Sequence, residues 1–230
     1  MAFNWQTFKT RTLTAAIFVV VMLAGLLINR WTFFILFSII HFGCWWEFVS
    51  LMKKIYSKNY LFYSLLGIAY ITLPISLLIA LRNFYGINIQ EDHWDLAKIL
   101  PMALIFSLWI NDTMAYIVGS LIGKTTMSKI SPKKTWEGTL GGVILSVIVI
   151  FLLAYYVFLF GIISYSLAVL AFIASIAGTF GDLFESKLKR MAGVKDSGHI
   201  MPGHGGFLDR FDSLLVAIPF VWLYVYIFMK

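Results

Sequence analysis

The chain has 230 residues, of which 60% are hydrophobic and 13% are charged, and its mean hydropathy is +0.87. Soluble domains carry about 25% charged residues, so this composition excludes an ordinary soluble domain and indicates an integral membrane protein. The net charge of +7 suits the orientation signals of a membrane protein, and it also suits anionic lipids or nucleotides. The single cysteine, Cys44, excludes an intrachain disulfide.

Long apolar runs follow one another along the whole chain. A hydrocarbon core about 30 Å thick needs roughly 20 apolar residues in a helix. This length predicts about seven transmembrane helices, at 12–29, 31–51, 60–82, 97–120, 138–160, 163–181 and 212–229. The first run has a basic start and no A-x-A site, so we expect an uncleaved span rather than a signal peptide. The predicted fold is an all-α polytopic membrane bundle. Residues 1–230 are expected to form one membrane domain, with the motif-bearing catalytic region at 96–213.

The basic residues predict the orientation of this bundle. If the N-terminus is cytoplasmic, 14 of the 18 Lys and Arg residues fall on the cytoplasmic side, and the other four are Arg30, Arg82, Lys98 and Lys230. This asymmetry favours a cytoplasmic N-terminus and an outer C-terminus. Eight of the 11 acidic residues also lie at or near the cytoplasmic ends of the predicted spans. Because acids contribute little to topology, they indicate a polar site on that face.

Residues 181–213 form the most highly charged segment of the chain and are expected to be a polar cytoplasmic loop region. Its first part is compatible with a helix, and one stripe of that helix would carry Asp182, Ser186, Lys189 and Arg190. Such a stripe could hold a metal and its phosphates, or it could belong to a solvated helix with an internal ion pair. The glycines from Gly193 to Gly206 then predict a loop. Glycines let backbone N–H groups approach a ligand closely, although a flexible hairpin has the same composition.

The last span opens with Asp209 and Asp212, three residues apart and on one side of the predicted helix. Acids in a first turn favour the helix dipole. That explanation accounts poorly for two acids and an arginine where a span enters lipid, and acids there are functional candidates. Paired carboxylates suit Mg²⁺. Asp112, in the inner half of the fourth predicted span, needs a cavity or a partner such as a lysine. His41 and Glu47 are expected to pair within the bundle in a structural role.

The motifs of the C-terminal half resemble those of a known family. The run "SKLKRMAGVKDSGHIMPGHGGFLDRFD", residues 186–212, closely resembles the signature of the phosphatidate cytidylyltransferases, also called CDP-diacylglycerol synthases. The upstream stretches "NDTMAYIVGSLIGK", "SPKKTWEG" and "GDLFES" also resemble that family. The resemblance implies that the phosphate of phosphatidate attacks the α-phosphorus of CTP. The products would be CDP-diacylglycerol, for phospholipid biosynthesis, and pyrophosphate.

The resemblance also implies roles for individual residues. Asp182 and Asp209 would hold Mg²⁺, Asp212 would assist through water, and a second cation is left open. The expected catalytic residues are Asp182, Asp209, Lys189 and Lys195. The expected substrate-binding residues are Asp112, Lys133, Lys134, Ser186, Arg190, Asp196, His204, Gly205, Gly206 and Arg210. In this set the cations would bind phosphate, the two glycines would let the chain pass close to the nucleotide, and His204 would have a positioning role.

The expected partners are CTP, phosphatidate and membrane lipids, with no nucleic acid, and a homodimer is left open. The expected location is the cytoplasmic, or inner, membrane, with the site facing the cytoplasm. Two other functions use similar residues. A CTP-dependent lipid-alcohol kinase would need the same metal and cations. A transporter or channel, lined by Asp112 and Asp182, would need charges across the bilayer depth, whereas the charges here gather at one face. A purely structural membrane protein needs no acidic cluster.

Overall fold

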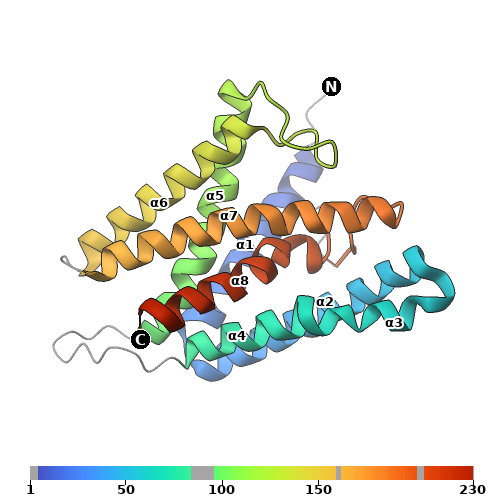
Figure 1. The fold of residues 1–230 in the computed structure, drawn as a ribbon, viewed down its shortest axis with the longest axis horizontal. Helices are drawn as coiled ribbons and strands as arrows, with labels where there is room; N and C mark the ends of the chain where they lie inside the picture. The colour runs from blue at the N-terminus through green and yellow to red at the C-terminus, as the bar shows by residue number, and fades with distance from the viewer. Residues whose placement is uncertain (1–4, 84–95, 159–161, 201–204, 230) are drawn as a thin grey trace. The chain divides into compact units, whose positions relative to one another are not determined.

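The computed structural model describes residues 5–83, 96–158, 162–200 and 205–229. These residues form eight α-helices and two short helical turns, and no strand occurs among them (Figure 1). The elements in chain order are α1 (Trp5–Leu27), α2 (Arg30–Tyr56), η1 (Ser57–Asn59), α3 (Tyr60–Ser64), η2 (Ile68–Thr72), α4 (Leu73–Arg82), α5 (Leu96–Ile122), α6 (Trp136–Phe158), α7 (Ile162–Met191) and α8 (Leu208–Phe228). The all-α prediction is therefore confirmed.

Five helical stretches of the described residues are long and apolar enough to cross a membrane, namely Arg30–Ser64, Leu96–Ile122, Trp136–Val157, Ile163–Met191 and Leu208–Phe228. The apolar stretches Thr12–Leu27 and Ile68–Arg82 are helical but shorter. The chain is thus a multi-pass membrane protein, and the count of seven spans stays a prediction. Two boundaries differ from those predicted. The helix predicted at 163–181 continues as α7 to Met191, and α8 begins four residues earlier than predicted.

The chain forms two compact units, each built from segments that are separate in sequence. The first unit comprises Met1–Ile75 and Lys187–Phe211, and the second comprises Ser76–Ser186 and Asp212–Lys230. Helices α4, α7 and α8 each contribute residues to both units, so this division does not test the single-domain prediction.

In the first unit, α2 packs against α1, α3 and η2. Its start is fixed by a capping box, in which the Asn29 side chain accepts from the Thr32 N–H and the Thr32 hydroxyl accepts from the Asn29 N–H. Large apolar side chains recur every three or four residues along α2 and form its buried face, which includes Phe33, Phe37, Ile40, Cys44, Phe48 and Leu51. The same face also carries Glu47, which is only 3% exposed.

In the second unit, small residues let the helix backbones approach closely, as is common in membrane bundles. Helices α5 and α6 pack along much of their length. A Cβ at Gly142 of α6 would lie 2.7 Å from the backbone oxygen of Asn111 in α5. Helices α7 and α8 meet at Gly181, where a Cβ would lie 2.5 Å from the backbone oxygen of Asp212. Glycines therefore fix the spacing of both helix pairs.

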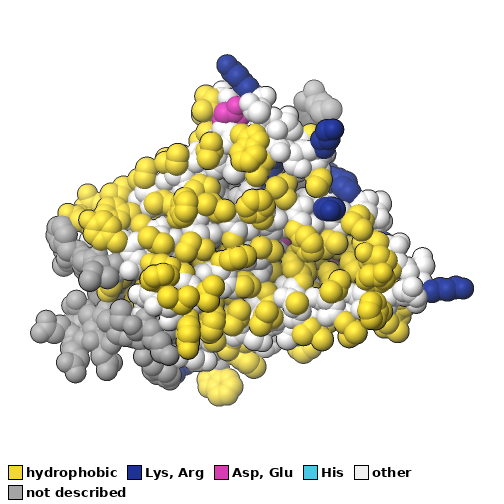
Figure 2. Space-filling view, in the orientation of Figure 1, with side chains coloured by type: hydrophobic (Ala, Val, Ile, Leu, Met, Phe, Trp, Pro, Cys, Tyr) yellow, Lys and Arg dark blue, Asp and Glu magenta, His cyan; other side chains and the backbone are white. Residues whose placement is uncertain are grey.

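The surface agrees with a membrane protein. Figure 2 shows one face on which hydrophobic side chains predominate. Large apolar side chains such as Phe42 (71%), Tyr156 (74%) and Phe228 (73%) are exposed to the surroundings of the chain. Exposed apolar area on this scale is expected where the surroundings are lipid tails.

Replacing Gly142 with alanine should destabilise the protein. Alanine is a better helix former than glycine by about 1 kcal/mol, so propensity alone predicts a gain. The added methyl group cannot fit against the Asn111 carbonyl, and such overpacking costs roughly 1–3 kcal/mol. Thermal unfolding in detergent should therefore show a lower midpoint for Gly142→Ala. The control is Leu140→Val on the exposed side of α6, which should unfold like the wild type. A higher midpoint for Gly142→Ala would contradict the packing argument.

Candidate functional site

Three carboxylates lie close together on α7 and α8 in the second unit. One oxygen from each of Asp182, Glu185 and Asp212 lies within 4.8 Å of the others, and we call these residues the acidic group. The close approach of the two helices at Gly181 brings Asp182 beside Asp212. Glu185 is fully buried and Asp212 is 8% exposed. Because up to three negative charges share a small volume built of oxygen ligands, the acidic group could hold a divalent cation.

Asp182 has two further neighbours in the second unit. The Lys134 ammonium forms an ion pair with one of its carboxylate oxygens, and the Ser186 hydroxyl donates to the other at 3.3 Å. The prediction that Asp182 and Ser186 share one helix stripe is therefore confirmed by a direct contact. Lys134 was predicted as a phosphate-binding residue, and the structure shows that it contacts a carboxylate of the acidic group.

The loop between α5 and α6, which carries Lys134, has a defined shape. The Met127 N–H donates to the Lys134 carbonyl at 2.8 Å, and a short antiparallel bridge joins Thr126 to Thr135. Glu137, in the first turn of α6, accepts the Thr125 N–H at 3.2 Å with both of its oxygens. These bonds hold the backbone on both sides of Lys134, so the approach of its side chain to Asp182 is built into the loop.

Asp209, in the first unit, is surrounded by hydrogen-bond donors. The Lys189 ammonium lies 2.6 Å from Oδ1, and Oδ2 accepts the Gly206 N–H at 2.8 Å. Ser197 donates its N–H at 2.9 Å and its hydroxyl at 2.8 Å, both to Oδ2. Gly205 has φ +81°, a conformation that favours glycine, and a Cβ there would lie 2.6 Å from Oδ2. The loop therefore folds tightly around Asp209. The lysine balances the charge of this carboxylate, and three neutral donors stabilise it by hydrogen bonds.

Glu47 is a second carboxylate at the same loop, and it comes from α2. Its Oε1 accepts the Phe207 N–H at 2.9 Å, and its Oε2 accepts the Leu208 N–H at 2.8 Å and the Ser197 hydroxyl at 2.7 Å. Glu47 was expected to pair within the bundle, and the partners that the structure gives it lie in the loop and at the start of α8. His41 contacts the Thr72 hydroxyl at 3.0 Å instead.

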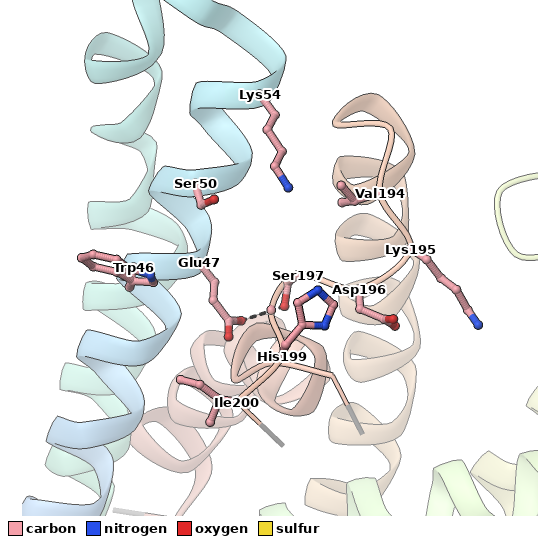
Figure 3. A pocket seen from close by; sticks show the side chains of 11 residues that line it. Trp46, Glu47, Ser50, Lys54, Val194, Lys195, Asp196, Ser197, His199 and Ile200 are labelled. Carbon is pink, nitrogen blue, oxygen red and sulfur yellow. Dashed lines mark hydrogen bonds between the residues drawn. The ribbon is translucent and has the colours of Figure 1, made fainter. Parts of the chain in front are cut away.

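A cavity of about 480 Å³ opens beside Glu47 in the first unit. Its walls are α2, with Trp46, Ser50 and Lys54, and the loop 194–200. Figure 3 shows Glu47 and Ser197 pointing toward one another from these two walls, whereas the Lys195 side chain points away from Glu47. The cavity therefore combines an aromatic ring, cationic side chains and a buried carboxylate.

The predicted site residues thus fall into two sets. The structure brings Asp182, Ser186, Lys134 and Asp212 together in the second unit, and Asp209, Lys189, Gly205 and Gly206 together in the first. The prediction that Asp182 and Asp209 share one metal stays a prediction. Asp112 accepts a hydrogen bond from the Asn111 amide at 3.3 Å. Four predicted cationic residues are exposed, namely Lys133, Arg190, Lys195 and Arg210, as is Asp196. His204 lies outside the described residues.

Sequence reasoning gave no site role to three residues that the structure brings into these sets, namely Glu185, Glu47 and Ser197. Glu185 lies three residues after Asp182 on α7, and that spacing alone places both on one side of the helix. Glu47 is an acid inside an apolar run, which is a signal of function in itself. Ser197 had no such signal, because serine is ordinary in a glycine-rich loop.

The comparisons with known proteins agree with these observations. The model of the cytidylyltransferase family matches residues 67–228. The chain is 39% identical over 175 residues to the phosphatidate cytidylyltransferase of Staphylococcus haemolyticus, which covers 75% of this chain and 64% of that protein. It is 38% identical over 175 residues to the phosphatidate cytidylyltransferase of Staphylococcus aureus. It is also 39% identical over 129 residues to the chloroplastic phosphatidate cytidylyltransferase 4 of Arabidopsis thaliana, which covers 54% of this chain and 32% of that protein.

The chain therefore spans slightly less than two thirds of the length of the staphylococcal relatives. The family match covers well over half of the chain, including the acidic group and the glycine-rich loop. This protein belongs to the cytidylyltransferase family.

Proposed function

We propose that this protein transfers CMP from CTP to phosphatidate, which yields CDP-diacylglycerol for phospholipid biosynthesis, together with pyrophosphate. The observation that supports this most is the acidic group, which lies on apolar helices within the family match. A soluble nucleotide and a lipid phosphate react only where a charged site meets the membrane. Carboxylates and lysines at the ends of membrane helices provide such a place.

The reaction needs positive charge more than it needs a base. An oxygen of the phosphatidate phosphate forms a bond to the α-phosphorus of CTP, and the bond from that phosphorus to the bridging oxygen breaks. The electron pair leaves with pyrophosphate. Because the attacking oxygen is already anionic, no residue has to remove a proton from it. The obstacle is the repulsion between two polyanions, which fixed positive charge reduces.

The residues of the acidic group fit a metal by their ligand chemistry, and Mg²⁺ is the cation that we propose for Asp182, Glu185 and Asp212. When bound, it would neutralise phosphate charge and help to orient the reacting groups. Asp209 remains a proposed metal-holding residue as well, and a second cation remains part of the proposal. Lys134 lies close enough to Asp182 to contact a phosphate bound there. Lys189 and the exposed cationic residues would bind phosphate oxygens, as would the backbone N–H groups of the loop.

The site is proposed to face the cytoplasm from the inner membrane. This orientation is supported by the distribution of the basic residues, because 14 of the 18 Lys and Arg residues are expected on the side that carries the site. Membrane lipid would then supply phosphatidate from the bilayer, and CTP would arrive from the cytoplasm.

The nucleotide phosphorus that is attacked tests this function directly. Purified protein should be given CTP labelled at the α- or at the γ-phosphorus, with Mg²⁺ and phosphatidate vesicles. We expect the α-label to enter the extracted lipid and the γ-label to leave as pyrophosphate. Lipid that carries the γ-label would instead identify a kinase that phosphorylates a lipid alcohol. Folded protein that labels lipid from neither nucleotide would refute the proposed function and favour the transporter hypothesis.

Removing one charge from the acidic group should abolish most of the activity. Asp182→Asn keeps the shape of the side chain but weakens cation binding and removes the partner of Lys134. We expect turnover to fall at least roughly 100-fold, about 2.7 kcal/mol, with a higher Mg²⁺ requirement. Asp209→Asn should cause a loss of similar size. The control is Asp95→Asn, the same chemical change in a segment expected on the opposite face. Normal Mg²⁺-dependent turnover of Asp182→Asn would contradict the metal assignment.

The orientation can be tested with a single reporter cysteine. Lys129 is exposed in the loop between α5 and α6, and Cys44 is buried, so Lys129→Cys in a Cys44→Ala background gives one accessible thiol. A membrane-impermeant thiol reagent should label the reporter thiol in inverted membranes and leave it unlabelled in intact cells. Labelling in intact cells would reverse the proposed orientation.

A further inference from the structure

Glu47 lies in the part of the chain that precedes the family match at residues 67–228, yet it contacts the loop between α7 and α8, which lies within that match. It is a carboxylate in the apolar span Arg30–Ser64 and is 3% exposed. A charge in such a position is expensive unless nearby donors satisfy it. The donors that satisfy the Glu47 carboxylate therefore indicate its role.

Two of these partners are the first backbone N–H groups at the start of α8. The initial N–H groups of a helix have no acceptor within the helix, and a negative charge at that end also favours the helix dipole. Glu47 accepts from Phe207 with one oxygen and from Leu208 with the other. A carboxylate from α2 thus caps α8 and fixes where its first turn begins. Asp209 is the next residue after Leu208, so its place depends on this cap.

The third partner connects Glu47 to Asp209 through one side chain. The Ser197 hydroxyl lies 2.7 Å from Glu47 Oε2 and 2.8 Å from Asp209 Oδ2. A hydroxyl has a single proton, which it donates to one of these oxygens at a time. The Ser197 hydroxyl therefore lies between the two carboxylates and links them through one shared donor, and Figure 3 shows the Glu47 side of this contact.

The glycines of the loop fit this arrangement. A Cβ at Gly198 or at Gly206 would overlap the Glu47 carboxylate. A larger residue at either position would displace the Glu47 carboxylate from its place against the loop. Five loop and helix positions thus converge on one side chain, which a solvated or merely tolerated carboxylate would not require.

We propose that Glu47 is a positioning residue for Asp209 and the start of α8, acting through Ser197 and through the first N–H groups of the helix. Its role in the reaction rests on the proposed function, in which Asp209 takes part. Catalytic groups must be held to within about 0.5 Å of their productive positions, so a loosened first turn would lower turnover. Glu47 itself need not touch a substrate or a metal for this effect.

The test compares Glu47→Gln with the wild type by hydrogen exchange and by kinetics. Glutamine has the same shape but only one acceptor oxygen, so its NH2 group leaves at least one of the three donors without an acceptor. We expect the amides of residues 206–211 to exchange about tenfold faster, because the first turn of α8 opens more often. With CTP, phosphatidate and Mg²⁺, kcat should fall about 10- to 100-fold, as for a misplaced catalytic group, with a smaller change in the KM for CTP.

Two further variants separate positioning from general destabilisation. Thr72→Val keeps the shape of the side chain but removes the hydrogen bonds of Trp45 and His41, which also belong to α2 in the first unit. It should lower thermal stability and leave kcat and the α8 amides unchanged. Ser197→Ala removes the link to Asp209 but retains the cap. It should lower kcat while the Phe207 and Leu208 amides exchange as in the wild type.

If the amides of residues 206–211 exchange hydrogen at the wild-type rate in Glu47→Gln, the proposed cap is overturned. Faster exchange with wild-type kcat would overturn the role in positioning Asp209. If the Glu47→Gln protein does not fold in sufficient amounts, the kcat of Ser197→Ala tests the inference in its place. An unchanged kcat in Ser197→Ala would overturn it. Wild-type protein that transfers no CMP would refute the proposed function alone, because the exchange measurement does not depend on turnover.

Discussion

Each carboxylate buried among these apolar helices must find its donors within the protein, because lipid tails offer none. Glu47 meets this constraint with two backbone N–H groups, and Asp209 meets it with a lysine and two N–H groups. The Ser197 hydroxyl lies within hydrogen-bond distance of both carboxylates and donates to one of them at a time. The loop between α7 and α8 supplies most of these donors. Its dense packing around two acids is thus a consequence of where the acids lie.

The same constraint has a different result in the second unit. Asp182 has Lys134 and Ser186 as neighbours, but Glu185 and Asp212 bring two more carboxylates within 4.8 Å. Like charges that share a small volume favour protonation or a bound cation. An ion pair with Lys134 reduces the charge without removing it, and it leaves a lysine at the edge of the acidic group. That combination of excess negative charge and a nearby ammonium suits a metal that carries phosphate, which is why we favour this function over a structural role.

The elements of the fold could be predicted from sequence because apolar runs of about 20 residues have few alternatives in a membrane. Helices occupy most of each of the seven predicted segments within the described residues, including 60–82, where α3, η2 and α4 follow one another. The ends of α7 and α8 were predicted less well. Asp182, Glu185 and Lys189 lower the hydropathy of the last turns of α7, although they continue the helix without interruption. Hydropathy indicates which residues lie in the apolar core of the membrane. A helix, however, can continue beyond that core for as long as its backbone hydrogen bonds continue.

The site could be predicted only where spacing along one helix determines proximity. Asp182 and Ser186 are four residues apart, and their contact followed from that spacing. The pairing of Asp209 with Lys189 crosses 20 residues of chain, including a loop whose path the sequence does not specify. Glu47 and Leu208 are 161 residues apart. No local pattern reports such a contact, so the sequence indicated that Glu47 was unusual but not which group it served.

The contact made by Glu47 also explains why a polar loop can depend on a segment with no motif of its own. One acceptor with two oxygens is enough to cap α8, and only one position on α2 has to supply it. The other side chains on the buried face of α2 need only be apolar and of suitable size, since they pack against neighbouring helices. A recognisable motif needs several fixed residue types at fixed spacing. A helix that contributes one carboxylate to a distant loop has none, even when the geometry of that loop depends on it.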